Sequence, residues 1–151
     1  MPAATSYETN KTALVGSQGD GVLAPAGYVP WIIPIQLASM TTAAADLITG
    51  FVPGFRGKIV SAQFFTTTLG TGSGASQVLN FEIGTTDLTG GVLTLTLATT
   101  TPLGNRIAAT AITANNEFTA TDAISLEVAA SGTVFTAGNG HIVVMLQNYD
   151  G

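Results

Sequence analysis

The densest group of residues that could do chemistry is the stretch EIGTTDLTGG, residues 82–91. Two carboxylates, three hydroxyls and three glycines within ten positions could supply oxygen ligands to a cation. A calcium loop of the EF-hand type needs carboxylates at every second position, however, and Glu82 and Asp87 do not have that spacing. Gly84 and the pair Gly90-Gly91 lie between two amphipathic runs and are typical of backbone turns. The stretch is therefore predicted to be a structural loop that binds no metal ion.

The other acids and the single histidine predict no catalytic centre. Asp122 and Glu127 also lack calcium-ligand spacing. A glycosidase needs two carboxylates, but Glu82 and Glu127 fall on the polar sides of alternating runs, where acids are usually solvated. His141 is the only histidine, so a histidine-rich metal site is excluded, and its place after a turn predicts a strand end rather than a base beside a serine. The chain is predicted not to be an enzyme and to bind no cofactor.

Two segments resemble the sequence motifs of phosphate-binding loops, but neither has the neighbouring residues or elements that such a loop requires. GTGSGA, residues 70–75, matches a relaxed dinucleotide fingerprint, but no helical pattern follows it. Gly57-Lys58 lacks the upstream glycine and the following hydroxyl of a P-loop. Arg56 and Lys58 form the only local basic pair, which either solvates the start of a strand or belongs to a contact surface.

The composition limits the classes of partner. The chain has 151 residues, enough for one domain with its own core, and no cysteine, which excludes disulfides and thiol chemistry. Its net charge is −5 with four Lys and Arg, which argues against nucleic acid. No run of 18 apolar residues predicts a membrane span. Only 9% of residues are charged against about 25% in an ordinary domain. This composition indicates either a Thr-rich β domain of the secreted kind or, the favoured interpretation, a subunit packed against other proteins.

The chain divides into an unpatterned arm and a region of strands. Residues 1–28 show no periodicity, whereas residues 29–151 alternate polar and apolar positions and are predicted to form one domain. Pro34 lacks an amide donor and places the first strand at a sheet edge. The predicted strands cover 29–37, 58–69, 79–83, 93–97, 124–128 and 141–147, with a helical turn at 42–46 and a flexible loop at 70–76.

Short strands, regular turn signals and no long helical pattern predict an all-β fold. The expected architecture is an antiparallel β-sandwich or jelly roll that carries the extended N-terminal arm. The strand at 141–147 is apolar on both faces, so it is predicted to be central in its sheet or covered by a second subunit.

Four motifs follow one another in a familiar order. They are GFVPGFRGKIVSAQFF, LNFEIGTTDLTGGVLTLT, TPLG and AITANNEF, and a final apolar strand completes a pattern that spans residues 37–146. This succession resembles the head decoration (cement) proteins of tailed bacteriophages, which are small β-sandwich proteins of the virion. None of the motifs is a catalytic signature, and the arm lies outside the resemblance.

The resemblance implies a structural role without an active site. A decoration protein is made in the host cytoplasm and binds the major capsid protein on the outer surface of the virion, often as a homotrimer; a homodimer is the alternative. The arm is predicted to contact the capsid or a neighbouring copy. The predicted contact residues are the apolar positions of the arm and the basic pair: Tyr7, Leu14, Val15, Val22, Leu23, Tyr28, Arg56 and Lys58.

Two other functions remain open. A trimeric phage fibre or receptor-binding domain is also β-rich and would present aromatic clusters in its loops. A secreted carbohydrate-binding module would need a platform of exposed Trp or Tyr, whereas Trp31, the only tryptophan, falls in a strand alternation.

Overall fold

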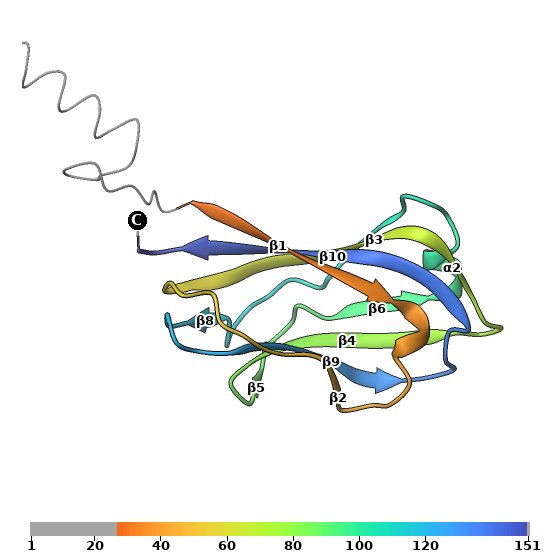
Figure 1. Cartoon of the computed structure of the whole chain (residues 1–151), viewed down its shortest axis with the longest axis horizontal. Coiled ribbons are helices and arrows are strands. Elements are labelled where there is room, and N and C mark those ends of the chain that lie inside the picture. Colours follow the sequence, from red (N-terminus) through yellow and green to blue (C-terminus); the bar gives the residue numbers. More distant parts are fainter. Residues whose placement is uncertain (1–26, 151) are drawn as a thin grey trace, which may run out of the picture.

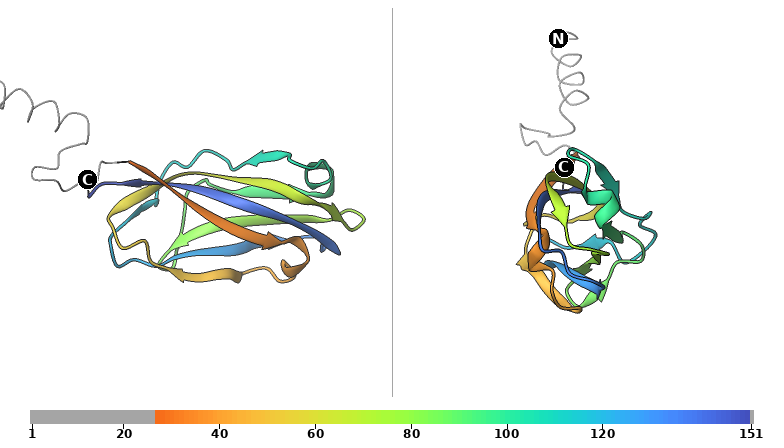
Figure 2. Two further views of the ribbon diagram at one scale, coloured as in Figure 1. Left: turned by 45° about the horizontal axis from the view of Figure 1, so that its top comes forward. Right: turned by 90° about the vertical axis from the view of Figure 1, so that its right-hand side faces the viewer.

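Two antiparallel β-sheets pack face to face and form a sandwich (Figure 1). The structure, a computed structural model, describes residues 27–150. The strands of both sheets run along the long axis of the molecule (Figure 2). The predicted all-β sandwich is confirmed, whereas the jelly-roll topology stays a prediction. No helix within the described range is long and apolar enough to cross a membrane.

Sheet A has its last strand in the middle. Its order is β1 (Tyr28–Gln36), β10 (Ala137–Asn148), β3 (Gly57–Thr71) and β7 (Arg106–Ala108), and β8 (Glu117–Phe118) also pairs with β3. The start of β1 and the end of β10 therefore lie side by side (Figure 1). The apolar strand predicted at 141–147 is central, as expected from its two apolar faces.

Sheet B lies on the other side of the core. Its order is β2 (Ala45–Phe51), β9 (Ile124–Ser131), β4 (Ser76–Ile83) and β5 (Thr86–Asp87), and β6 (Leu93–Thr96) also pairs with β4. The two short helical turns, η1 (Leu37–Ser39) and α2 (Leu97–Thr100), follow β1 and β6.

The core is built from alternate residues of both sheets. Phe64 on β3 and Phe81 on β4 are fully buried, as their period-two alternation predicts. Burying a large apolar side chain contributes about 1.5–3 kcal/mol, so the inner faces hold the two sheets together. The largest fully buried side chains are Phe64, Phe81, Phe135, Ile33, Leu37, Met40, Ile59, Leu79, Leu93, Leu95, Ile124 and Leu126.

The free edge of β1 is short of amide donors. The amide of Asn148 donates to the carbonyl of Gly27 at 2.9 Å, so the hydrogen-bonded pairs of this ladder fall on the odd-numbered residues of β1. The even-numbered residues direct their backbone nitrogens away from β10. Two of these residues are Pro30 and Pro34, which have no N–H to offer. The edge position predicted from Pro34 is confirmed, and Pro30 strengthens it.

Two local predictions were wrong. Residues 42–46 do not form a helical turn, because Ala45 and Asp46 pair with Val128 and Glu127 of β9 and begin β2. The strand predicted at 93–97 ends at Thr96, whose side chain forms a capping box with Thr99 and starts α2.

The arm is only partly described. Tyr28, assigned to the arm from the sequence, is the first residue of β1. The predicted contact residues Tyr7, Leu14, Val15, Val22 and Leu23 lie outside the described residues. The loop predicted at 70–76 is shorter than expected, because β3 continues to Thr71 and β4 begins at Ser76.

Candidate functional site

The outer face of sheet A carries a group of exposed and half-buried apolar side chains. On β1, Ile33 and Ile35 are buried in the core, so the alternate residues Ile32 and Pro34 face outward. Ile32 is 59% exposed. Isolated exposed apolar residues are ordinary, but a contiguous group of them marks an interaction surface.

The strand register makes the group contiguous. Ile32 lies opposite Val143 of β10, and Val143 lies opposite Gln63 of β3. In the neighbouring row, His141 lies between Pro34 and Phe65. In the row on the other side of Ile32, Pro30 lies opposite Met145. We define the apolar strip as Pro30, Ile32, Pro34, Phe65, Val143 and Met145.

Charged residues flank the strip but do not enter it. Arg106 on β7 lies opposite Phe65, beyond one long side of the strip. At one end, Tyr28, Gln147 and Lys58 form a row across β1, β10 and β3. Tyr28 is 64% exposed, whereas Lys58 is half-buried and lies opposite Glu117. The strip can therefore meet another apolar surface without burying a charge.

Three of the predicted contact residues come together at this end of sheet A. Tyr28 and Lys58 share the row described above, and Arg56 lies just before β3. The Nε atom of Arg56 is 3.5 Å from a carboxylate oxygen of Asp150, and the Arg56 amide donates to the same carboxylate at 2.6 Å. The positive charge of Arg56, one of the two predicted basic contact residues, is therefore balanced in part by Asp150 of the same chain.

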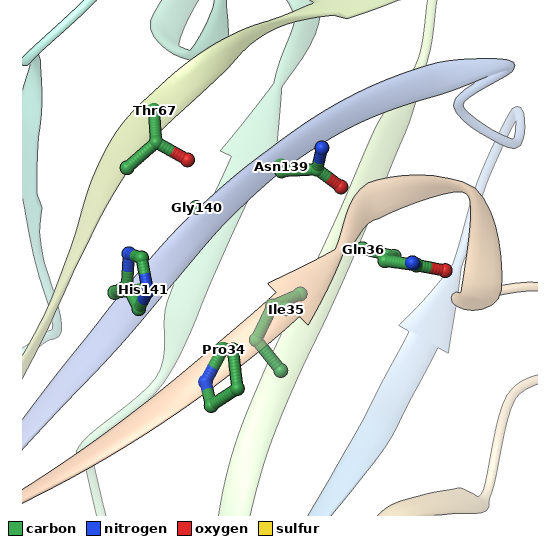
Figure 3. A pocket seen from close by; sticks show the side chains of 7 residues that line it. All are labelled: Pro34, Ile35, Gln36, Thr67, Asn139, Gly140 and His141. Atoms are coloured by element: carbon green, nitrogen blue, oxygen red, sulfur yellow. The ribbon is translucent and has the colours of Figure 1, made fainter.

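A shallow hollow of about 440 Å³ opens at the other end of the strip. Figure 3 shows His141 and Asn139 on β10, Thr67 on β3, and Pro34 and Gln36 on β1 around it. Among its described lining residues there is no carboxylate, so no acid in the hollow orients His141. The hollow offers the hydrogen-bonding amides of Gln36 and Asn139, the hydroxyl of Thr67 and the imidazole of His141.

Gly140 shapes the floor of the hollow. A Cβ atom added there would overlap the ring of Phe64 and the backbone carbonyl oxygen of Phe65. The core ring of Phe64 therefore packs directly against the β10 backbone, which only glycine allows at this position.

Three acids gather on the outer face of sheet B. Asp46 on β2, Glu127 on β9 and Glu82 on β4 have carboxylate oxygens within 4.8 Å of one another. Burial raises the pKa of Glu82, and the hydrogen bond and charge of Asp87 and the charges of Glu127 and Asp46 raise it further. Burial also raises the pKa of Glu127, with further contributions from Asp87 and Asp46.

The sequence did not predict this acidic cluster. Glu82 and Glu127 were recognised as strand residues, but Asp46 was assigned to a helical turn. The cluster becomes apparent only from the register between strands. Asp46 pairs with Glu127, and Glu82 pairs with Ser125, the next outward residue of β9. Carboxylates could hold a cation there, although exposed acidic groups commonly gather without one.

The glycines of the 82–91 stretch have structural roles. Gly84, Gly90 and Gly91 have φ angles of 65°, 82° and 72°, which disfavour residues with a side chain. At Gly90 a Cβ atom would also overlap the backbone carbonyl of Ala111. The glycines are thus explained by turns and close backbone approach, as predicted.

No family model, curated protein or solved structure matches the chain. The basis for a functional proposal is therefore the residues themselves and the surfaces that the fold gives them. Of these surfaces, the apolar strip is the one whose chemistry points to a protein partner.

Proposed function

We propose that the chain is a structural virion protein that binds the outer surface of a tailed-phage capsid and stabilises it. The observation that carries the proposal is the apolar strip on a protein with only 9% charged residues. Such a surface favours burial against other proteins. The motif succession that resembles phage head decoration proteins supports the same role.

The proposal gives the protein two kinds of partner. The major capsid protein is contacted by the end of sheet A that carries Tyr28, Arg56 and Lys58, together with the arm in residues 1–28. Other copies of the chain form a homotrimer or a homodimer. Linking several weak contacts raises the effective concentration of each, so modest affinity at one contact is enough to hold an oligomer on a symmetric capsid.

Trp31 does not form the exposed aromatic platform that a carbohydrate-binding module would need. Its ring is half-buried, stacks on Phe51 and is tilted against Phe81. Tyr28 is 64% exposed, but a single open ring does not make a platform of several rings. The fibre or receptor-binding alternative has no specific observation in its favour.

The proposal is tested with undecorated, expanded heads of the phage that encodes the chain. The purified protein is mixed with heads, the heads are sedimented, and the bound copies are counted against added protein. We expect saturable binding and heads that withstand more heat before they release DNA. Absence of binding at micromolar concentration would contradict the proposal.

A charge-reversal pair locates the capsid contact. Lys58→Glu lies in the proposed contact region, and Arg106→Glu lies in the same sheet, beyond the strip, with the same charge change. We expect Lys58→Glu to weaken attachment about tenfold and Arg106→Glu to leave it within about twofold. Equal effects would mean that the contact depends on net charge rather than on this region.

Deleting residues 1–20 tests the arm. Because residues 29–151 are expected to fold on their own, the truncated protein should keep its melting temperature and lose affinity for heads. Attachment as tight as that of the full chain would show that the arm is not the anchor. Loss of folding would show that the arm belongs to the domain.

A further inference from the structure

We infer that the apolar strip of sheet A is the surface through which copies of this chain pack on one another, face against face. This inference rests on the self-association in the proposed function and specifies where that association occurs. Either two faces across a two-fold axis or three faces around a common axis would bury the strip.

The free edge of β1 argues for packing through the face rather than through the strand. Adding a strand to an edge requires a row of free N–H and C=O groups. On β1 the nitrogens that point outward belong to even-numbered residues, and those of Pro30 and Pro34 carry no hydrogen. Extension of sheet A by another strand is thus obstructed, while the side chains of the same two prolines add to the apolar face.

The size of the strip sets how much of the contact it can supply. Nine residues of β1 extend about 30 Å, and the three strands that carry the strip, β1, β10 and β3, are about 14 Å wide. This outline is roughly 420 Å², about half of the 800 Å² that a standard interface buries on each partner. The strip is therefore the apolar centre of the contact, and the rim of sheet A around it supplies the remaining area.

The charge distribution favours a second copy as the occupant. None of the six residues of the strip carries an ionisable side chain, so two copies do not repel each other there. The acidic cluster of Asp46, Glu82 and Glu127 lies on the outer face of sheet B, on the opposite side of the sandwich. Packing sheet A against sheet A keeps these like charges apart, whereas packing through sheet B would bring them together.

The first test compares oligomeric state. Light scattering after size exclusion at micromolar concentration should give an oligomer for the full chain. The double variant Ile32→Asp/Val143→Asp should raise the dissociation constant at least about tenfold, because carboxylates would be buried without partners. Leu103→Asp is the matched control, since Leu103 is 64% exposed in the loop before β7 and is not one of the six residues of the strip, and it should leave the mass unchanged.

The outcomes separate this inference from the proposed function. An unchanged mass of the double variant would overturn the strip as the contact and leave self-association standing. A monomeric full chain would overturn the inference, while the binding of heads would still be decided separately. If the aspartate variant does not fold, Ile32→Thr/Val143→Thr serves in its place, with a smaller shift expected in the same direction.

Alkylation of a single cysteine identifies what covers the strip. The chain has no cysteine, so Ile32→Cys introduces the only thiol, and Leu103→Cys is its control. Protection of Cys at position 32 that increases with protein concentration would support a second copy. Protection independent of concentration would mean that the same chain covers the strip, and no protection would mean that nothing does; either result overturns the inference.

Discussion

The ring of Trp31 lies parallel to that of Phe51, with centroids 4.0 Å apart and an interplanar angle of 14°. Trp31 belongs to β1, an edge of sheet A, and Phe51 belongs to β2, an edge of sheet B. Phe81 of β4 contacts the same indole with its centroid at 6.2 Å. The stack therefore joins the two sheets along one side of the sandwich.

Trp31→Ala should lower the free energy of unfolding by about 2–3 kcal/mol, because it removes a half-buried indole ring and the stacking contact of that ring with Phe51. Trp31→Phe should lose less, because a smaller ring can still stack. Urea unfolding should be followed by circular dichroism, since the variant has no tryptophan fluorescence. A loss below about 0.5 kcal/mol for Trp31→Ala would show that the stack does not hold the sheets together.

Gly140→Ala should destabilise the protein by about 2–3 kcal/mol, because its Cβ atom would overlap Phe64 and the Phe65 carbonyl. Gly104→Ala is the control: its site is open, and only its positive φ of 71° is unfavourable, at about 1 kcal/mol. Adding Phe64→Leu to Gly140→Ala should recover part of the melting temperature. Equal melting temperatures for Gly140→Ala and the parent would contradict the proposed close packing.

Period-two alternation predicted most of the long strands because their apolar residues face one core. Ile124, Leu126 and Val128 are all buried, as their alternation indicates. Strand β2 was missed because its ladder to β9 has register shifts on both sides of Ile48, which remove the regular alternation. The acidic cluster was missed with it, since Asp46 belongs to β2.

The sequence predicted only the part of the apolar strip that lies on β10. The two apolar faces of β10 were recognised, which led to the expectation of a central or covered strand. The partners of Val143 and Met145 depend on register with β1 and β3, and alternation within one strand does not fix register between strands.

Lowering the pH from 7 should stabilise the fold through the acidic cluster. The pKa values of Glu82 and Glu127 are raised in the folded state, so this state binds protons more readily than the unfolded chain. Their contribution is fully present below the ordinary glutamate pKa near 4.5 and is lost as pH rises through the raised values. Glu127→Gln should therefore raise the melting temperature at pH 7 and reduce its dependence on pH, whereas Glu117→Gln on sheet A should not reproduce this effect. A lower melting temperature for Glu127→Gln at pH 7 would reverse this interpretation.

Chelation of divalent cations should leave the melting temperature unchanged. The glycines of the 84–91 loop are explained by their turns, and the acids of the cluster lie on strands held by backbone ladders. Thermal unfolding with and without a chelator measures this directly. A fall of several degrees that added Ca²⁺ restores, and that Glu127→Gln abolishes, would instead identify a cation site.

Replacing both prolines of β1 should make the protein aggregate. Pro30→Thr/Pro34→Thr restores two amide donors on the free edge, which can then pair with the edge of another molecule. Light scattering and an amyloid dye should both increase during incubation at 37 °C. Pro102→Thr, in the loop before β7, is the control and should behave like the parent. Unchanged solubility of the double variant would show that the prolines do not protect this edge.

The position of β10 between β1 and β3 affects how the chain can fold during its synthesis. Tyr28 pairs with Gln147, so the first strand of the sheet has no partner until the last one has left the ribosome. Contacts so distant in sequence are slow to form, and β-sandwiches rich in them fold in milliseconds to seconds. The nascent chain thus carries β1 without a strand partner, and β3 without its longest one, until β10 has been made, and sheet A closes in one late step.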